Sequence, residues 1–203
     1  MSKVYSWRKL NEKELTRVYL DEMRRDFPPT ELKPLSMILN SEADGTAHTW
    51  GVFDGETLAA YLLMVRPAGS RVSQLDYFAV LPEYRAAGLG AQLLADLPQH
   101  ERGAQAILIE AECPDKAEDE AMAVRRLGFY ARNGARTAGY DTEMFGVPYK
   151  TLYWADGKVD ESALMEEHRF VYASTFAPDK FRRYVRIPFD PNGTPGERVS
   201  WQQ

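Results

Sequence analysis

Helical spacing of apolar residues dominates the first forty positions of the chain. After a short predicted strand at 4–10, apolar side chains recur every three or four residues through 12–25, and Asn11 is a suitable N-cap. The two prolines within 27–30 should end this helix. A second helix is expected to begin at Thr30 or Glu31.

The middle of the chain changes to β-favouring runs separated by turns and two further helical segments. Residues 48–53 and 57–65 flank Asp54-Gly55-Glu56, which predicts an antiparallel hairpin because glycine supplies the positive φ of a tight turn. The remaining elements expected up to residue 154 are strands at 71–80, 105–111, 136–142 and 149–154 and helices at 90–97 and 118–133.

These elements predict an α/β (α+β) fold with a central mixed, mostly antiparallel sheet flanked by helices. We expect one domain over residues 1–154. Residues 155–203 carry a charged, aromatic-bearing pattern with segments at 161–176 and 180–187 and a Pro-Gly-rich end. This C-terminal extension is expected to be helical and to pack on the domain or at an oligomer interface, which leaves a homodimer open.

Composition excludes several classes of protein. The chain has 203 residues, a formal net charge of −5, and no apolar run long enough to cross a membrane or export signal at its start, so we expect a cytoplasmic protein without a membrane partner. A net negative charge disfavours nucleic acid as a partner. One cysteine and three widely separated histidines offer no metal-ligand spacing, so no metal is expected.

The most informative segment, 80–90, joins a predicted strand to a predicted helix. Ala86, Ala87, Gly88, Leu89 and Gly90 surround a helix N-terminus whose free amides suit a pyrophosphate. The small side chains allow close approach of the backbone, and Arg85 can add a charge-assisted contact. The alternative is an ordinary glycine turn beside a solvated arginine. Neither a P-loop lysine nor the third glycine of a dinucleotide motif is present, since Leu93 stands at that position.

At these residues the sequence resembles the GNAT superfamily of N-acetyltransferases. Arg85, Gly88 and Gly90 match the family pattern of Arg or Gln, two residues, Gly, one residue, then Gly or Ala, and the resemblance extends over about 4–154. It implies the GNAT-like fold and acetyl-CoA as acyl donor. It also implies that Phe78, Ala79 and Val80, on a bulged strand, hold the pantetheine and polarise its thioester.

A second matching segment, 126–134, contains Tyr130, which the resemblance implies as the general acid for the departing CoA thiolate. Packing of the helix against the sheet is the alternative role. The match is incomplete, because Ala123 replaces a common Asn and Ala135 stands where Phe often follows the glycine. Pantetheine contacts from this helix are therefore not implied.

Direct attack needs a neutral amine and hence a base. Glu110 and Glu112 end a buried strand and share one face; Glu110, where the resemblance often implies a base or a water-holding residue, is the first candidate, and an exposed or ion-paired glutamate is the alternative. Cys113 lacks a histidine partner and is not expected to be a nucleophile. Acidic residues from 110 to 120 either attract a cationic amine or form a solvated helix entrance.

These residues predict transfer of an acetyl or short acyl group from acyl-CoA to a primary amine of a small molecule, peptide or protein, by direct attack in a ternary complex. The alternative is a noncatalytic acyl-CoA-binding regulatory module.

Overall fold

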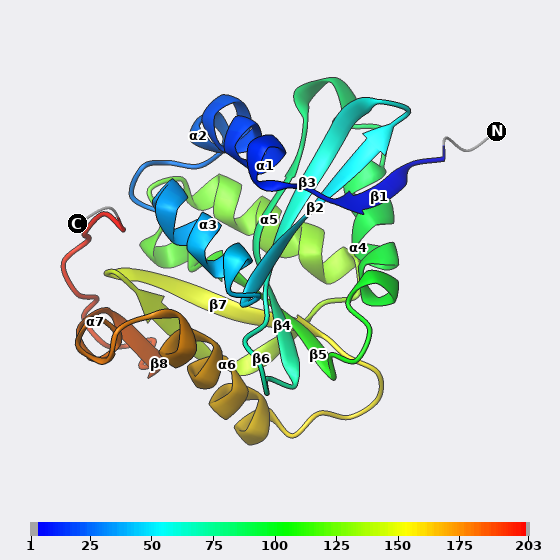
Figure 1. Ribbon diagram of the computed structural model, residues 1–203. Helices are drawn as coiled ribbons and strands as arrows, with labels where there is room; N and C mark the ends of the chain where they lie inside the picture. Colours follow the sequence, from blue (N-terminus) through cyan, green and yellow to red (C-terminus); the bar gives the residue numbers. More distant parts are fainter. Residues whose placement is uncertain (1–3, 202–203) are drawn as a thin grey trace.

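Eight strands form one sheet in the computed structural model, which describes residues 4–201 (Figure 1). Their order across the sheet is β1-β2-β3-β4-β5-β7-β6-β8, and only β4 and β5 are parallel neighbours. The strands are β1 (Ser6–Lys9), β2 (Ala47–Asp54), β3 (Thr57–Val65), β4 (Val72–Val80), β5 (Ala106–Glu112), β6 (Arg136–Met144), β7 (Val147–Trp154) and β8 (Val185–Phe189). The expected mixed, mostly antiparallel sheet is thus confirmed.

Helices cover both faces of this sheet and create two apolar cores. The main helices are α1 (Glu12–Val18), α2 (Arg24–Asp26), α3 (Leu35–Ala43), α4 (Leu89–His100), α5 (Glu120–Arg132), α6 (Glu161–Thr175) and α7 (Pro178–Tyr184). Buried apolar residues of α1, α3 and α6 belong to one core, and those of α4 together with Tyr130 of α5 belong to the other. Of the helices in the described chain, none has the length and apolar character needed to span a membrane.

The first helical segment begins as the sequence predicts. The Asn11 side chain accepts a hydrogen bond from the Glu14 amide and Glu14 returns one to the Asn11 amide, which is a capping box. A π-helical stretch, Tyr19–Met23, joins α1 to α2. The second helix was misplaced by prediction: it begins at Leu35 because Pro34 disfavours helical backbone at the residue before it.

A fork between β4 and β5 positions the site. The two strands pair from Val72↔Ala106 to Leu75↔Ile109, and their recorded pairing ends there. On the other side of β4 the register with β3 shifts so that Asp76 is the extra residue of a β-bulge, while β5 continues to pair with β7 as far as Glu112. The bulge that the resemblance implied is present, at the point where the fork opens.

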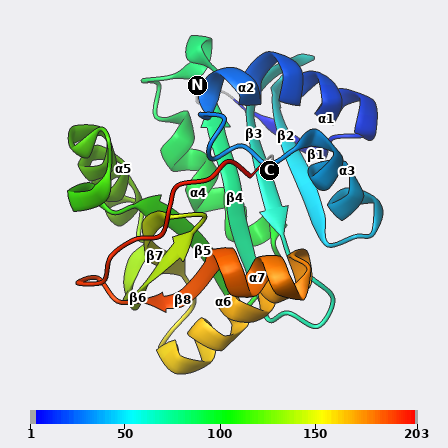
Figure 2. The ribbon, with the colours of Figure 1, turned by 90° about the vertical axis from the view of Figure 1, so that its left-hand side faces the viewer.

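Helices α6 and α7 confirm the expected helical C-terminal extension, and the strand β8 is an addition that the sequence did not predict. The predicted helix 180–187 ends at Tyr184, and β8 pairs antiparallel with β6. Val185, Ile187 and Phe189 are buried whereas the residues between them are exposed. Residues 190–201 then leave β8 and cross in front of β4 toward α2 and α3 (Figure 2).

Candidate active site

A cavity of about 500 Å³ lies at the fork. One wall is the end of β4, the opposite wall includes Ile109 and Glu110 of β5, and α5 adds Arg126 and Tyr130. Phe78, Ala79 and Val80 line it and are partly exposed, as a strand that receives a ligand requires. The structure therefore gathers Phe78, Ala79, Val80, Arg85, Glu110 and Tyr130, which the sequence singled out separately, around one space.

The loop before α4 forms a small concave backbone surface. Ala86 and Gly88 have φ of 63° and 78°, and Gly88 is the N-cap of α4 in left-handed conformation. Ala86, Ala87 and Gly88 are exposed, and within the described chain the amides of residues 86–90 have no backbone acceptor. Such a run of free amides at a helix N-terminus favours phosphate oxygens.

The last two residues of this loop have different roles. The Leu89 side chain is buried in the core under α4, so only its backbone can face a ligand. Gly90 is favoured by close packing, because a Cβ there would lie 3.3 Å from Phe129 Cζ, which would have to shift slightly, and 3.6 Å from a Val80 methyl group. Gly90 thus fixes the start of α4 against β4 and α5.

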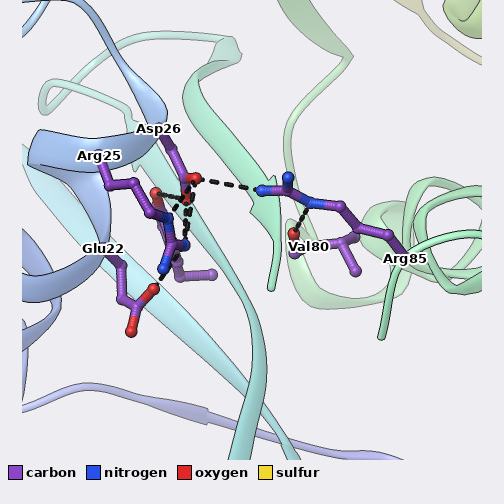
Figure 3. Close-up of polar contacts among 6 residues, drawn as sticks. Glu22, Arg25, Asp26, Val80 and Arg85 are labelled. Atoms are coloured by element: carbon purple, nitrogen blue, oxygen red, sulfur yellow. Dashed lines mark hydrogen bonds and ion pairs between the residues drawn. The ribbon is translucent and has the colours of Figure 1, made fainter. Parts of the chain in front are cut away.

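Arg85 extends from this loop toward α2 (Figure 3). Its Nε donates to the Val80 carbonyl at 2.8 Å, and its Nη2 donates to Asp26 Oδ1 at 3.1 Å. The side chain is 53% exposed, so its remaining N–H groups can reach a phosphate. Asp26 also accepts hydrogen bonds from Arg25 and from the Tyr61 hydroxyl. The arginine is therefore oriented by its neighbours rather than freely solvated.

Glu110 lies at the floor of the cavity within a buried polar cluster. Its carboxylate accepts hydrogen bonds from Thr142 Oγ1, from the Tyr172 hydroxyl and, at 3.1 Å, from Gln74 Nε2. His168 Nε2 lies 3.5 Å from Oε1 without a hydrogen bond to any described residue. Glu110 is thus held by side chains from β4, β6 and α6.

Burial controls the protonation of this cluster. It raises the pKa of Glu110 to about 7, although the hydrogen bonds from Thr142 and Tyr172 act in the opposite direction. Burial also lowers the pKa of His168 to about 3, so the imidazole is neutral at physiological pH. A carboxyl group whose pKa lies near neutrality can exchange a proton with a substrate at little cost, as general base catalysis requires.

Tyr130 is buried on α5 and faces the same cavity. Burial raises the pKa of its phenol to about 12, with Arg126 acting in the opposite direction. Its ring packs edge-on against Trp154, and its hydroxyl makes no hydrogen bond within residues 4–201. The phenol is therefore protonated at neutral pH and oriented by packing, which leaves both predicted roles, acid and packing group, compatible with its position.

Glu112, the second candidate base, has a different environment. Its Oε1 accepts a hydrogen bond from Arg198 Nη2 at 2.8 Å, and it lines a neighbouring pocket rather than the main cavity. Cys113 is buried, and burial raises the pKa of its thiol to about 12, which disfavours a thiolate nucleophile. Within the described chain, no three His, Cys, Asp or Glu side chains are grouped as a metal site.

Several residues that hold Glu110 could not be found from local motifs. Gln74, Thr142 and Tyr172 belong to no spacing pattern with Glu110, from which they are separated by 36, 32 and 62 residues. The only usable signal was helical spacing: His168 and Tyr172 are four apart and so share one face of α6. Only the tertiary fold determines which strand lies opposite that face of α6.

Comparison with protein families gives a direct result. Residues 5–129, more than half of the chain, match the model of the acetyltransferase (GNAT) family. The chain belongs to the GNAT acetyltransferase family. Acetyl transfer from acetyl-CoA to amines is the general activity of this family, and the acceptor of this member is not set by the match. Among curated proteins, no sequence matches this chain.

Solved structures of GNAT proteins share the fold at low sequence identity. A GNAT-family protein from Bacteroides thetaiotaomicron is 20% identical, with a TM-score of 0.65 over 84% of this chain and 98% of its own. The ribosomal-protein-S18-alanine N-acetyltransferase of Escherichia coli is 17% identical, with a TM-score of 0.57 over 78% and 97%. The spermidine N-acetyltransferase of Vibrio cholerae, solved with CoA and spermine, is 13% identical, with a TM-score of 0.53 over 74% and 94%. At these identities the likeness concerns the fold alone.

Proposed function

We propose that this GNAT protein transfers an acetyl, or another short acyl, group from acyl-CoA to a primary amine by direct attack within a ternary complex. The observation that carries the proposal is that one cavity is bordered by Arg85 of the phosphate loop, the bulged end of β4, Glu110 and Tyr130. Each part of the reaction thereby has a group at the same space. The free amides at residues 86–90 and Arg85 would hold the pyrophosphate, and residues 78–80 the pantetheine.

Proton transfer is assigned to two side chains. Glu110 accepts a proton from the ammonium form of the acceptor, and the neutral nitrogen attacks the thioester carbon as the C–S bond breaks. Tyr130 donates a proton to the departing sulfur and recovers one as the new amide loses its second proton. The products are the N-acyl amide, the CoA thiol and one proton.

A noncatalytic acyl-CoA-binding module is the second candidate. It is favoured by the hydrogen bonds that already occupy Glu110, because a carboxylate with three donors also suits a purely structural role. The two functions predict the same cofactor affinity and opposite results for turnover.

Calorimetric titration with acetyl-CoA, beside dephosphorylated pantetheine as the ligand without pyrophosphate, tests the binding step. We expect saturable binding that requires the pyrophosphate. Thiol release is then followed with a panel of amines, using Tyr130→Phe as the variant that retains the ring. Binding without thiol release for any amine would favour the noncatalytic module, and absence of binding would overturn both candidates.

A further inference from the structure

Aromatic rings from five parts of the chain contribute to the lining of the cavity. They come from the loop after α2, β4, β7, α6 and the C-terminal segment, which are far apart in the sequence: Phe27, Tyr77, Tyr149, Tyr172 and Trp201. Aromatic faces attract cations and accommodate apolar groups. The cavity therefore suits a ligand that combines both properties.

Four carboxylates, Asp26, Glu31, Asp76 and Glu110, line the cavity beside Arg25, Arg85 and Arg126, and Arg25 and Arg85 both bind Asp26. Asp76 is neutralised by the buried Lys33 ammonium at 2.6 Å. The Glu31 carboxylate is partly buried and forms no ion pair or hydrogen bond with any residue of the described chain. Burial raises the pKa of Glu31 and the charge of Glu112 acts in the same direction, whereas Arg126 and Arg198 favour its charged form. Arg198 is already paired with Glu112 and Glu118. Glu31 is thus available to bind a cation, while Glu110, whose carboxylate already accepts three hydrogen bonds, remains as the proposed base.

The C-terminal segment 190–201 bridges the open fork. Arg198 binds Glu112 at the end of β5, and Ser200 Oγ donates at 3.2 Å to the carbonyl of Pro29 in the loop after α2. Between these two contacts the Val199 amide donates a hydrogen bond to the Phe145 carbonyl. Trp201 is 7% exposed, with its ring centroid 4.4 Å from that of Phe145. The segment crosses in front of β4 (Figure 2), so a polypeptide laid across the fork would meet it. The cavity of about 500 Å³, which Trp201 lines, has room for a small molecule.

We propose that the acceptor is a small primary alkylammonium ion with an apolar body and no carboxylate, bound between Glu31, Glu110 and the wall formed by Trp201. This inference rests on the proposed function and adds the chemical class of the acceptor. Trp201 determines specificity by closing the cavity and contacting the apolar body. Glu31 favours the cation and disfavours an acceptor that carries its own acid.

Two matched pairs of acceptors test the charge requirement. Pentylamine and norleucine, or phenethylamine and phenylalanine, differ only in the α-carboxylate, and acetyl-CoA is the donor. We expect kcat/KM to be about tenfold or more higher for each amine, since repulsion between like charges at close range costs several kcal/mol. The α-amino group of the amino acid is the weaker base and is more often neutral, so basicity cannot produce this preference.

Two substitutions test the named residues. Glu31→Gln keeps the side-chain volume and should reduce the preference for pentylamine over norleucine, while Trp201→Ala should raise the KM for pentylamine by about tenfold. Phe170→Ala, which removes a 41% exposed ring from α6, is the matched control and should change neither value. Unchanged acetyl-CoA affinity shows that a variant is folded, and Trp201→Phe should recover part of the KM loss.

The outcomes separate this inference from the proposed function. Faster transfer to amino acids or to a peptide than to the matched amine, with acetyl-CoA bound, overturns the acceptor class and leaves acyl transfer intact. An unchanged preference in Glu31→Gln and an unchanged KM in Trp201→Ala overturn the assignment of these residues. Acetyl-CoA binding without transfer to any acceptor overturns the proposed function itself.

Discussion

The hydroxyl of Tyr172 should set the pH at which this protein becomes active. It donates a hydrogen bond to Glu110 Oε2 from α6, so it stabilises the carboxylate form that accepts a proton. A hydrogen bond to a charged group contributes about 1.5–3 kcal/mol, and one pKa unit corresponds to about 1.4 kcal/mol. In Tyr172→Phe we therefore expect the pKa of Glu110 to rise from about 7 by about one to two units. The smaller value applies if Gln74, whose Nε2 donates both to Glu110 Oε2 and to the Tyr172 hydroxyl, compensates for the lost hydrogen bond.

The assay is the pH profile of kcat at saturating acetyl-CoA and pentylamine. Because Glu110 must be deprotonated to act as a base, activity rises with pH through its pKa, and the rising limb should move to higher pH in Tyr172→Phe. Tyr153→Phe is the control, since that hydroxyl donates to Glu161 and not to Glu110. A lower kcat with an unmoved limb would assign Tyr172 a structural role only. An unmoved limb that also persists in Glu110→Gln would remove Glu110 as the base.

Three further variants test the cofactor loop, the acid and the buried carboxyl group. Gly88→Glu should weaken acetyl-CoA binding by about tenfold or more in calorimetry, because its carboxylate would repel the pyrophosphate. Gly55→Glu, at φ of 59° in the β2–β3 turn, is the control for backbone strain. Equal acetyl-CoA affinities of the two variants would refute pyrophosphate binding by the loop before α4. Tyr130→Phe should lower kcat on the order of 100-fold with little change in acetyl-CoA affinity, and undiminished thiol release would leave Tyr130 a packing group. Glu110→Gln should reduce the fall in Tm between pH 5 and pH 8. The pKa of Glu110 in the folded protein, about 7, exceeds the ordinary 4.5, so ionisation removes about 3 kcal/mol of stability as the pH rises through this interval. An equal fall in Tm for the variant and the unmodified protein would contradict that pKa.

The parts of the fold that the sequence predicts are those determined by local chemistry. The β2–β3 hairpin follows from the turn at Asp54-Gly55-Glu56, and the loop before α4 follows from small residues between a strand and a helix. The start of α3 follows from one backbone rule: Lys33 precedes Pro34, and a residue before proline disfavours helical backbone. These features depend on residues close together in the chain.

The strand β8 carried a weaker signal. Val185, Ile187 and Phe189 alternate with Arg186 and Pro188, which is the period of a half-buried strand. Five residues with a proline are a short pattern, and the preceding helix made continuation of the helix the simpler prediction. Pairing with β6 decides the conformation, and that partner lies more than forty residues away.

The surroundings of Glu110 and Glu112 show why the domain boundary matters for the chemistry. Alternation along β5 places both carboxylates on one face and cannot choose between them. The choice comes from the C-terminal extension: Tyr172 of α6 donates to Glu110, whereas Arg198 forms an ion pair with Glu112 and removes it from the cavity. We therefore expect the segment after residue 154 to be part of the catalytic unit rather than an appendage. Arg198→Ala tests this expectation. Loss of the ion pair should loosen the segment that carries Trp201 and raise the KM for pentylamine, while the rising limb of the pH profile of kcat, assigned to Glu110, stays at the same pH. A shifted limb with an unchanged KM would show that the two carboxylates are not separated in this way.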